Sequence, residues 1–200
     1  MNTTSPAVAD WPGLLAGAHK ALRTAVAGVA PNAWDRPTPC AKWSVAQVLQ
    51  HASGDQIAFA AAITGGPWPS EDPFAPSGQL VQDGQTLVDG AVAASAQAFE
   101  AVDREAAEVA NPLPQGPMPA WLAAGACALD AAVHAWDIAV ATGQASPLSE
   151  DMARQLMSVA TRIVEPLRAY GAYAPALVPR QDGDVAALLG YLGRESTWRQ

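Results

Sequence analysis

The feature that most constrains this chain is an alanine-rich segment, residues 120–142, that carries a carboxylate and an imidazole four positions apart. Asp130 and His134 lie in the run Leu129-Asp130-Ala131-Ala132-Val133-His134-Ala135-Trp136-Asp137. Alanine is the strongest helix former, so the segment favours a helix. On a helix, positions i and i+4 lie one above the other on the same face. Asp130 and His134 can therefore reach one metal ion from a single rigid element, although they cannot complete a site alone.

Helical periodicity extends over most of the chain. Apolar residues recur at helical spacing, between caps, prolines and glycines, over about 11–30, 45–64, 82–107, 120–142 and a fifth segment from 150 to about 167. A short apolar segment, 185–192, follows. Strand-like alternation and internal repeats are not evident. The sequence predicts an all-α fold with a four-helix core and additional C-terminal helices, in one domain spanning residues 1–200.

The second expected helix has the clearest start and carries the best partner for the Asp130–His134 pair. Ser44 and Gln47 have capping-box spacing, and Trp43 and Val48 occupy the positions of a hydrophobic staple. His51 follows Val48 by three residues and shares part of the inward stripe. A lone histidine in such a stripe is more often a hydrogen-bonded core residue than a ligand. Both interpretations of His51 stay open at this point.

A long connection at residues 65–82, rich in proline and glycine, bears on whether His51 can meet the pair. His51 lies about 10 Å from the start of its helix, and His134 about 12 Å from the end of its own. They share a level of the bundle only if the second and fourth helices are antiparallel. An up-down-down-up order gives that arrangement and needs a long crossover between the second and third helices. Loop length and ligand spacing therefore predict the same topology.

Two imidazoles and one carboxylate would leave open coordination positions, which is typical of catalytic rather than structural metal sites. Zn²⁺ is the default ion, and the same ligand set also serves Ni²⁺ and non-haem Fe²⁺. The alternative is that Asp130 and His134 form only an intrahelical hydrogen-bonded pair, which is common at this spacing.

Five nearby residues have alternative roles. Asp137 can orient an imidazole as a hydrogen-bond acceptor; the alternatives are a structural salt bridge or a surface position. Cys127 is expected to be a small core residue, with a substrate-side thiol or fourth ligand as the alternative. His19 is expected to be solvated or at the core edge and is kept as a reserve ligand. Trp68 and Phe74, in the long connection, can help to cover a pocket.

The charge of the chain excludes several classes of partner. A formal net charge of −8 and an isoelectric point near 4.7 disfavour nucleic acid and anionic membrane surfaces. Residues 1–6 are polar rather than a signal sequence, and no run reaches the roughly 18 uninterrupted apolar residues of a membrane span. Cys40 and Cys127 do not make a secreted disulfide framework. The expectation is a soluble cytoplasmic protein. Phosphate-loop, dinucleotide, CxxC and nucleophile-elbow motifs are lacking.

Three stretches match a known pattern. Thr38-Pro39-Cys40-Ala41-Lys42-Trp43-Ser44-Val45, followed by His51, resembles the TPC-x-x-W-(S/T)-V…H opening of the DinB-like superfamily. Residues 129–139 with Thr142-Gly143-Gln144 resemble the (D/E)-x-x-x-H-x-W-D-(L/I)-A…TG signature of one branch, the N-terminal domain of mycothiol-dependent maleylpyruvate isomerase. Leu189-Gly190-Tyr191-Leu192-Gly193-Arg194 is similar to the LLxxLGR ending of that branch.

The resemblance implies an up-down-down-up four-helix bundle that binds a divalent metal through His51, Asp130 and His134. Characterised members of the family include isomerases and S-transferases that use low-molecular-weight thiols such as mycothiol. There the metal would lower the pKa of the thiol and hold the thiolate beside an electrophile. The isomerase pattern has glutamate where this chain has Asp130, and this chain has no counterpart of the isomerase's additional C-terminal domain. The specific isomerase activity is therefore left open.

The leading hypothesis is a metal-dependent thiol transferase or isomerase that acts on a small electrophilic molecule. One alternative is a metal-dependent hydrolase or lyase of secondary metabolism, with metal-activated water in place of the thiol. Another is a non-catalytic bundle that binds a metal or small ligand in a stress role. Thiol-dependent turnover distinguishes the first from the others. The sequence assigns no general acid or base, and a homodimer is compatible with the family.

Overall fold

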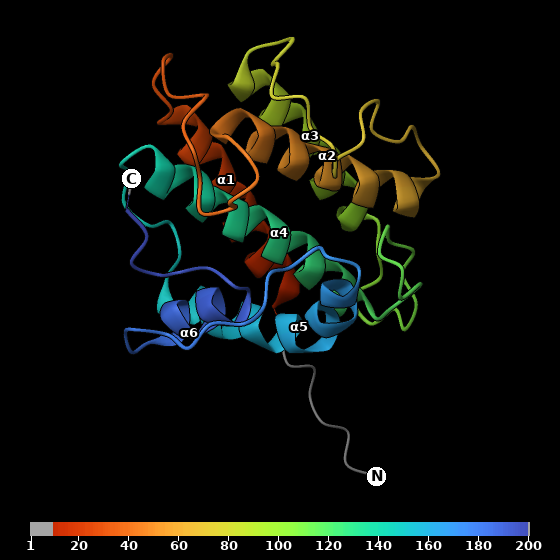
Figure 1. Ribbon diagram of the computed structural model, residues 1–200. Coiled ribbons are helices and arrows are strands. Elements are labelled where there is room, and N and C mark those ends of the chain that lie inside the picture. The colour runs from red at the N-terminus through yellow and green to blue at the C-terminus, as the bar shows by residue number, and fades with distance from the viewer. Residues whose placement is uncertain (1–9, 200) are drawn as a thin grey trace.

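The computed structural model describes residues 10–199, and its regular elements over that range are all helices. They are α1 (Trp11–Ala27), α2 (Val45–Thr64), α3 (Gly84–Glu100), α4 (Ala120–Ala141), α5 (Glu150–Ala169) and α6 (Asp184–Tyr191) (Figure 1). The all-α prediction is confirmed. The polar stretch expected at residues 1–6 lies outside the described residues.

Helices α1 to α4 form a four-helix bundle in which each helix packs against two of the others. α4 contacts α1 and α2, and α3 contacts the same two helices from the other side. Arg23 pairs with Asp89, while His19, one turn earlier on α1, meets Ser95, farther along α3. Residue numbers rise on α1 as they fall on α3, so these two helices are antiparallel.

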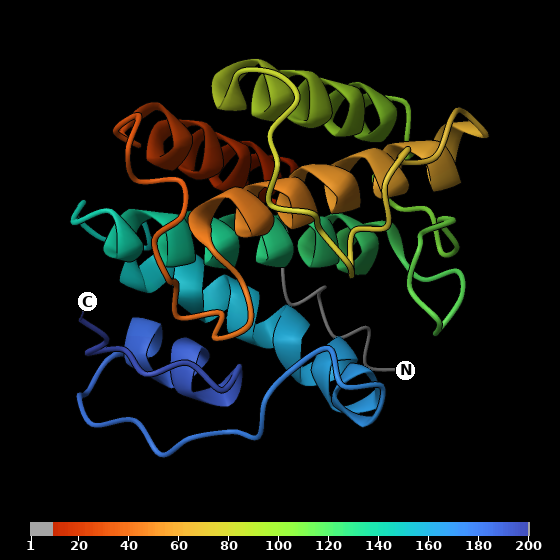
Figure 2. The ribbon, with the colours of Figure 1, turned by 45° about the horizontal axis from the view of Figure 1, so that its top comes forward.

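The same reasoning orients α2 against α4. His51 lies beside Asp130, whereas Gln56, farther along α2, donates to the carbonyl of Cys127, which precedes Asp130. α2 and α4 are therefore antiparallel, and Figure 2 shows α2 and α3 running in the same direction. The order is up-down-down-up, as the long connection predicted.

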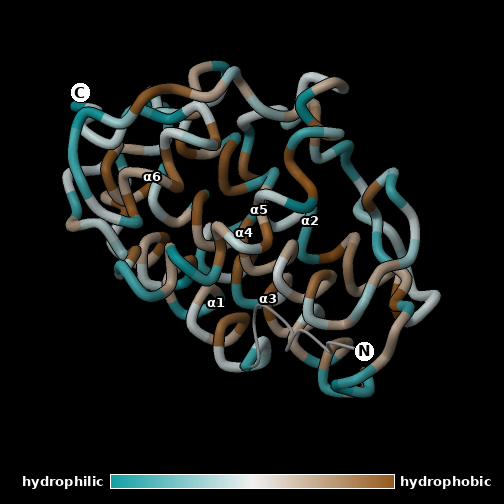
Figure 3. Tube along the Cα trace, turned by 90° about the horizontal axis from the view of Figure 1, so that it is seen from below, coloured by the Kyte–Doolittle hydropathy of each residue, from teal (hydrophilic) through white to brown (hydrophobic). Residues whose placement is uncertain are grey.

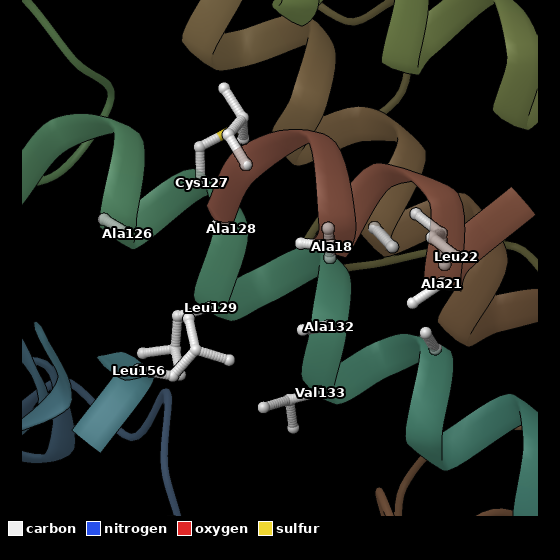
Figure 4. Packing of buried hydrophobic residues seen from close by; sticks show 14 of the residues in the cluster. Ala18, Ala21, Leu22, Ala126, Cys127, Ala128, Leu129, Ala132, Val133 and Leu156 are labelled. Atoms are coloured by element: carbon white, nitrogen blue, oxygen red, sulfur yellow. The ribbon is translucent and has the colours of Figure 1, made fainter. Parts of the chain in front are cut away.

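Helix α4 is the centre of the molecule. Within residues 10–199 it is the one helix long and apolar enough to cross a membrane by length and composition, yet 89% of that apolar window is buried inside the fold. Alanines permit this close packing: Figure 4 shows Ala128 and Ala132 of α4 next to Ala18 and Ala21 of α1. The apolar character of α4 thus matches its role as a core helix.

Helices α5 and α6 add a second layer over α4. α5 packs on α4, where Gly125 leaves room for Val159, because an added Cβ would come within 2.5 Å of a Val159 methyl group. α6 packs on α5. Figure 3 views the chain from this side, with hydrophobic stretches mostly inside the outline and hydrophilic stretches mostly along its edge.

Most expected helix boundaries agree with the structure, and α3 is the main correction. It was expected to run to Ala107 but ends at Glu100. The Asp103 side chain accepts a hydrogen bond from the Glu105 backbone N–H, and the Ala106 N–H donates to the Asp103 carbonyl. Aspartate stabilises such turns by competing for backbone donors. α1 is also slightly shorter than expected, ending at Ala27 rather than near residue 30.

A buried polar layer crosses the bundle with one residue from each core helix. The Gln56 Oε1 atom lies 2.9 Å from His19 Nε2 and accepts hydrogen bonds from the Ser95 hydroxyl at 2.8 Å and the Cys127 thiol at 3.0 Å. All four side chains are buried. His19 is thus an interior residue, not the solvated or core-edge residue expected.

The buried position of His19 gives a testable dependence of stability on pH. Burial lowers the pKa of His19 to about 4, although the bond to Gln56 acts in the opposite direction. The unfolded chain therefore takes up the proton first, near the ordinary histidine pKa of about 6.5. Stability contributed by neutral His19 is present above that pH and is lost as the pH falls toward 4, by up to about 3 kcal/mol.

Denaturant unfolding of wild type and His19→Gln between pH 7 and pH 4 measures this effect. Groups that titrate in both proteins cancel in the comparison, so the wild type should lose the larger amount of stability. The same pH dependence in both proteins would contradict a neutral, buried His19.

Candidate metal centre

The start of α2 fixes the position of the first histidine. The Ser44 side chain accepts a hydrogen bond from the Gln47 N–H, and the Gln47 side chain accepts one from the Ser44 N–H, which confirms the predicted capping box. Gly65 ends the helix with φ of 71°. Between these ends His51 is buried and lies beside α4.

The three predicted ligands meet. His51 Nε2 lies 3.5 Å from Asp130 Oδ1, and His134 Nε2 lies 3.4 Å from the same oxygen. One donor atom from each residue lies within 4.8 Å of the others. Good N–H···O hydrogen bonds measure about 2.7–3.2 Å, so these separations are too long for strong ones. Two ligands at about 2.0–2.1 Å from a tetrahedral Zn²⁺ are roughly 3.3 Å apart, which these spacings match.

A further observation supports the fit of a cation to these residues. The second oxygen of Asp130, Oδ2, is buried and has no hydrogen-bond partner among the described residues. Leaving a buried charged oxygen unpartnered is costly. Two imidazole nitrogens and a carboxylate with an unused oxygen form a donor set suited to Zn²⁺, Ni²⁺ or Fe²⁺.

The long α2–α3 connection orients His51 from outside. The Nδ1 atom of His51 lies 2.8 Å from the carbonyl oxygen of Pro73, so Nδ1–H donates there and Nε2 is left free to coordinate. The next residue, Phe74, contacts the His51 ring edge-on at 5.6 Å between centroids, and Trp43 lies 4.5 Å from it. The connection therefore contributes both the Pro73 carbonyl and the Phe74 ring to the surroundings of His51.

His134 is oriented in the same way by a buried ion pair. Its Nδ1 atom lies 2.9 Å from Asp137 Oδ2. Asp137 also accepts hydrogen bonds from Arg194, with Nη2 at 2.8 Å and Nε at 2.9 Å. Asp137 is fully buried and the Arg194 side chain is 9% exposed. Asp137 therefore both orients an imidazole and forms a structural salt bridge, and the alternative of a surface position is wrong.

The charges explain why this group of residues favours a cation. Burial lowers the pKa of His134, but the Asp130 and Asp137 carboxylates outweigh it and raise that pKa to about 10. Burial also lowers the pKa of His51, yet Asp130 and Asp55 give a net increase. Burial raises the pKa of Asp130, but both histidines hold it below its usual range. The carboxylates therefore attract protons, and a divalent cation would replace those protons.

Asp55 is a fourth charged group that the sequence analysis missed. Its Oδ2 atom lies 3.8 Å from His51 Nε2, one helical turn along α2. Burial and the Asp130 carboxylate both raise the pKa of Asp55. A signal was available, because His51 and Asp55 have the same i,i+4 spacing that drew attention to Asp130 and His134.

Other candidate ligands lie elsewhere. His19 and Cys127 belong to the buried polar layer. Cys40, a free thiol like Cys127, is within electrostatic range of His134 and Asp137 but is not one of the three donors. Trp68 is 59% exposed. A cavity of about 220 Å³ lies beside α6, and of the residues around the three-donor cluster only Arg194 lines it. The three-residue cluster, not this cavity, is the candidate centre.

Fold and site together define a class of protein: an up-down-down-up helical bundle in which an antiparallel helix pair brings together a His/Asp/His donor set. The model of the mycothiol maleylpyruvate isomerase N-terminal domain family matches residues 15–139, which include all three donors. The chain belongs to this family.

The individual relatives carry no activity in their descriptions. Two uncharacterized proteins of Mycobacterium tuberculosis, from strains CDC 1551 / Oshkosh and ATCC 25618 / H37Rv, are each 31% identical over 152 residues. The match covers 74% of this chain and 76% of each relative. No solved structure gives a significant match.

Proposed function

We propose that this protein is a metal-dependent enzyme of the thiol-dependent S-transferase or isomerase type, acting on a small electrophilic molecule. A divalent metal, with Zn²⁺ the first choice and Ni²⁺ or Fe²⁺ as alternatives, is held by His51, Asp130 and His134. Mycothiol or another low-molecular-weight thiol is the cosubstrate. The observation that carries the proposal is the convergence of three donor atoms, within 4.8 Å of one another, around a carboxylate with an unpartnered oxygen.

The roles of the residues follow from their contacts. When bound, the ion would lower the pKa of a thiol or water at its open position and supply a nucleophile near neutral pH. Pro73 and Asp137 fix the rings of His51 and His134 with Nε2 facing the centre, and Arg194 holds Asp137 in place. Outer partners of this kind raise ligand basicity and metal affinity.

The proposal extends to location and partners. A net charge of −8 supports a small-molecule substrate rather than nucleic acid or an anionic membrane. Burial of α4 in the bundle supports a soluble, cytoplasmic protein. The same proposal treats residues 1–200 as one functional unit and the protein as a homodimer.

A turnover assay tests the function. The protein is loaded with Zn²⁺, Ni²⁺ or Fe²⁺ and supplied with mycothiol or 2-mercaptoethanol, with maleylpyruvate for isomerisation and 1-chloro-2,4-dinitrobenzene for S-transfer. Turnover should require both metal and thiol and should disappear on chelation. Turnover without a thiol would favour the hydrolase or lyase alternative, and stoichiometric metal without turnover would favour a binding protein.

A further inference from the structure

Asp55 lies beside the three-donor cluster without belonging to it. It repeats on α2 the carboxylate–imidazole spacing of Asp130 and His134 on α4, in the opposite order along the chain. Its side chain is 18% exposed, compared with 12% for Asp130. Asp55 is therefore slightly more accessible than the carboxylate of the donor cluster.

The charge of Asp55 has no dedicated partner. Within residues 10–199 its ion pair is with His51 alone, at 3.8 Å. The guanidinium that reaches this centre, that of Arg194, is occupied by Asp137 through both Nε and Nη2. The positive charge of Arg194, which could otherwise attract an anionic substrate, is thus already neutralised by Asp137.

Aromatic rings also border His51. The Trp43 ring lies 4.5 Å from the His51 ring, and the Phe74 ring lies 5.6 Å from it with its side chain 65% exposed. Aromatic faces accept apolar groups and attract cations. The surroundings of His51 thus combine a carboxylate with two aromatic side chains.

The Asp55 carboxylate lies next to the donor cluster, with its Oδ2 atom 3.8 Å from His51 Nε2. Asp55 and Asp130 together would then balance the ion, while Arg194 balances Asp137. A bound thiolate would then give the centre a net negative charge. A thiol that carries a second negative charge would therefore be repelled. We propose that Asp55 makes the metal centre select neutral or cationic ligands and reject anionic ones. This inference rests on the proposed metal centre, and it predicts a substrate unlike maleylpyruvate, which is a dicarboxylate.

Three thiols with the same two-carbon chain test the selectivity: thiocholine (cationic), 2-mercaptoethanol (neutral) and 2-mercaptoethanesulfonate (anionic). Each is titrated into the Co²⁺-loaded protein, and binding is followed by the visible absorption of Co²⁺. The quantity compared is the affinity ratio of thiocholine to 2-mercaptoethanesulfonate. Intrinsic differences between the thiols cancel when this ratio in a variant is divided by the wild-type ratio.

In Asp55→Asn and Asp55→Ser the affinity ratio should fall about tenfold at low ionic strength, and less at high salt. Glu108→Gln removes the same charge from an exposed residue of the α3–α4 connection and should leave the ratio unchanged. Two different Asp55 substitutions guard against a local folding defect, which circular dichroism and Co²⁺ stoichiometry would detect.

The outcomes separate the inference from the proposed function. An unchanged ratio in an Asp55 variant that still binds Co²⁺ overturns the inference and leaves the metal centre standing. A wild type that binds no Co²⁺ overturns the metal centre and the inference with it. Co²⁺ binding with no response to any thiol overturns the thiol-dependent function together with the inference.

Discussion

Replacing Arg194 by methionine is expected to lower the free energy of unfolding by about 3–5 kcal/mol, because it leaves the Asp137 carboxylate buried without its cationic partner. Asp137 is fully buried, and Arg194 supplies its shortest bond at 2.8 Å. Burial raises the pKa of Asp137, but Arg194 reverses the shift and keeps the carboxyl ionised. A loss of this size is a large fraction of the stability of an ordinary domain. Urea unfolding of the metal-free protein measures it.

Two comparisons isolate the buried pair. Arg180→Met removes a guanidinium from an exposed pair with Glu195, where the arginine side chain is 75% exposed, and should cost less than about 1 kcal/mol. The double variant Asp137→Asn/Arg194→Met should recover part of the loss, because the neutral amide can still accept the His134 hydrogen bond. A loss in Arg194→Met no larger than that in Arg180→Met would contradict the structural role of the pair.

Metal affinity should fall more than about 100-fold in His134→Ala, because one of the three donors is lost. In Asp137→Asn the metal affinity should fall about 10–100-fold, the range expected for an outer partner that orients a ligand. His19→Gln should bind metal as the wild type does, because His19 contacts Gln56 and Ser95 rather than the centre. Competition with a chromophoric chelator measures all three variants. Equal affinity in His134→Ala and His19→Gln would remove His134 from the site.

The local part of the fold was predictable because its signals are local. Ser44 and Gln47 form the expected capping box, and Gly65 ends α2 where the sequence indicated. Topology was predictable because 65–82 is long enough to cross the bundle and the donors can meet only on antiparallel helices. The shorter α3 was not foreseen, because Asp103 stabilises a turn within a stretch that still has helical periodicity.

The roles of residues that act across long separations were missed. Arg194 lies 57 positions from Asp137, and nothing in its local sequence shows that α5 and α6 bring the two together. The carbonyl of Pro73 orients His51 as a backbone group, which leaves no residue-type signal. Gln56 and Ser95 join a buried network whose members come from four helices. Such partners are set by packing in three dimensions and not by spacing along the chain.

The most direct test of the metal centre is anomalous X-ray diffraction from crystals of the purified protein loaded with Zn²⁺, collected on both sides of the zinc absorption edge. The account predicts one strong anomalous peak bonded to His51 Nε2, Asp130 and His134 Nε2, at about 2.0–2.2 Å from each donor. A peak at other residues, or none at these three after loading, would contradict the metal centre on which the proposed function depends.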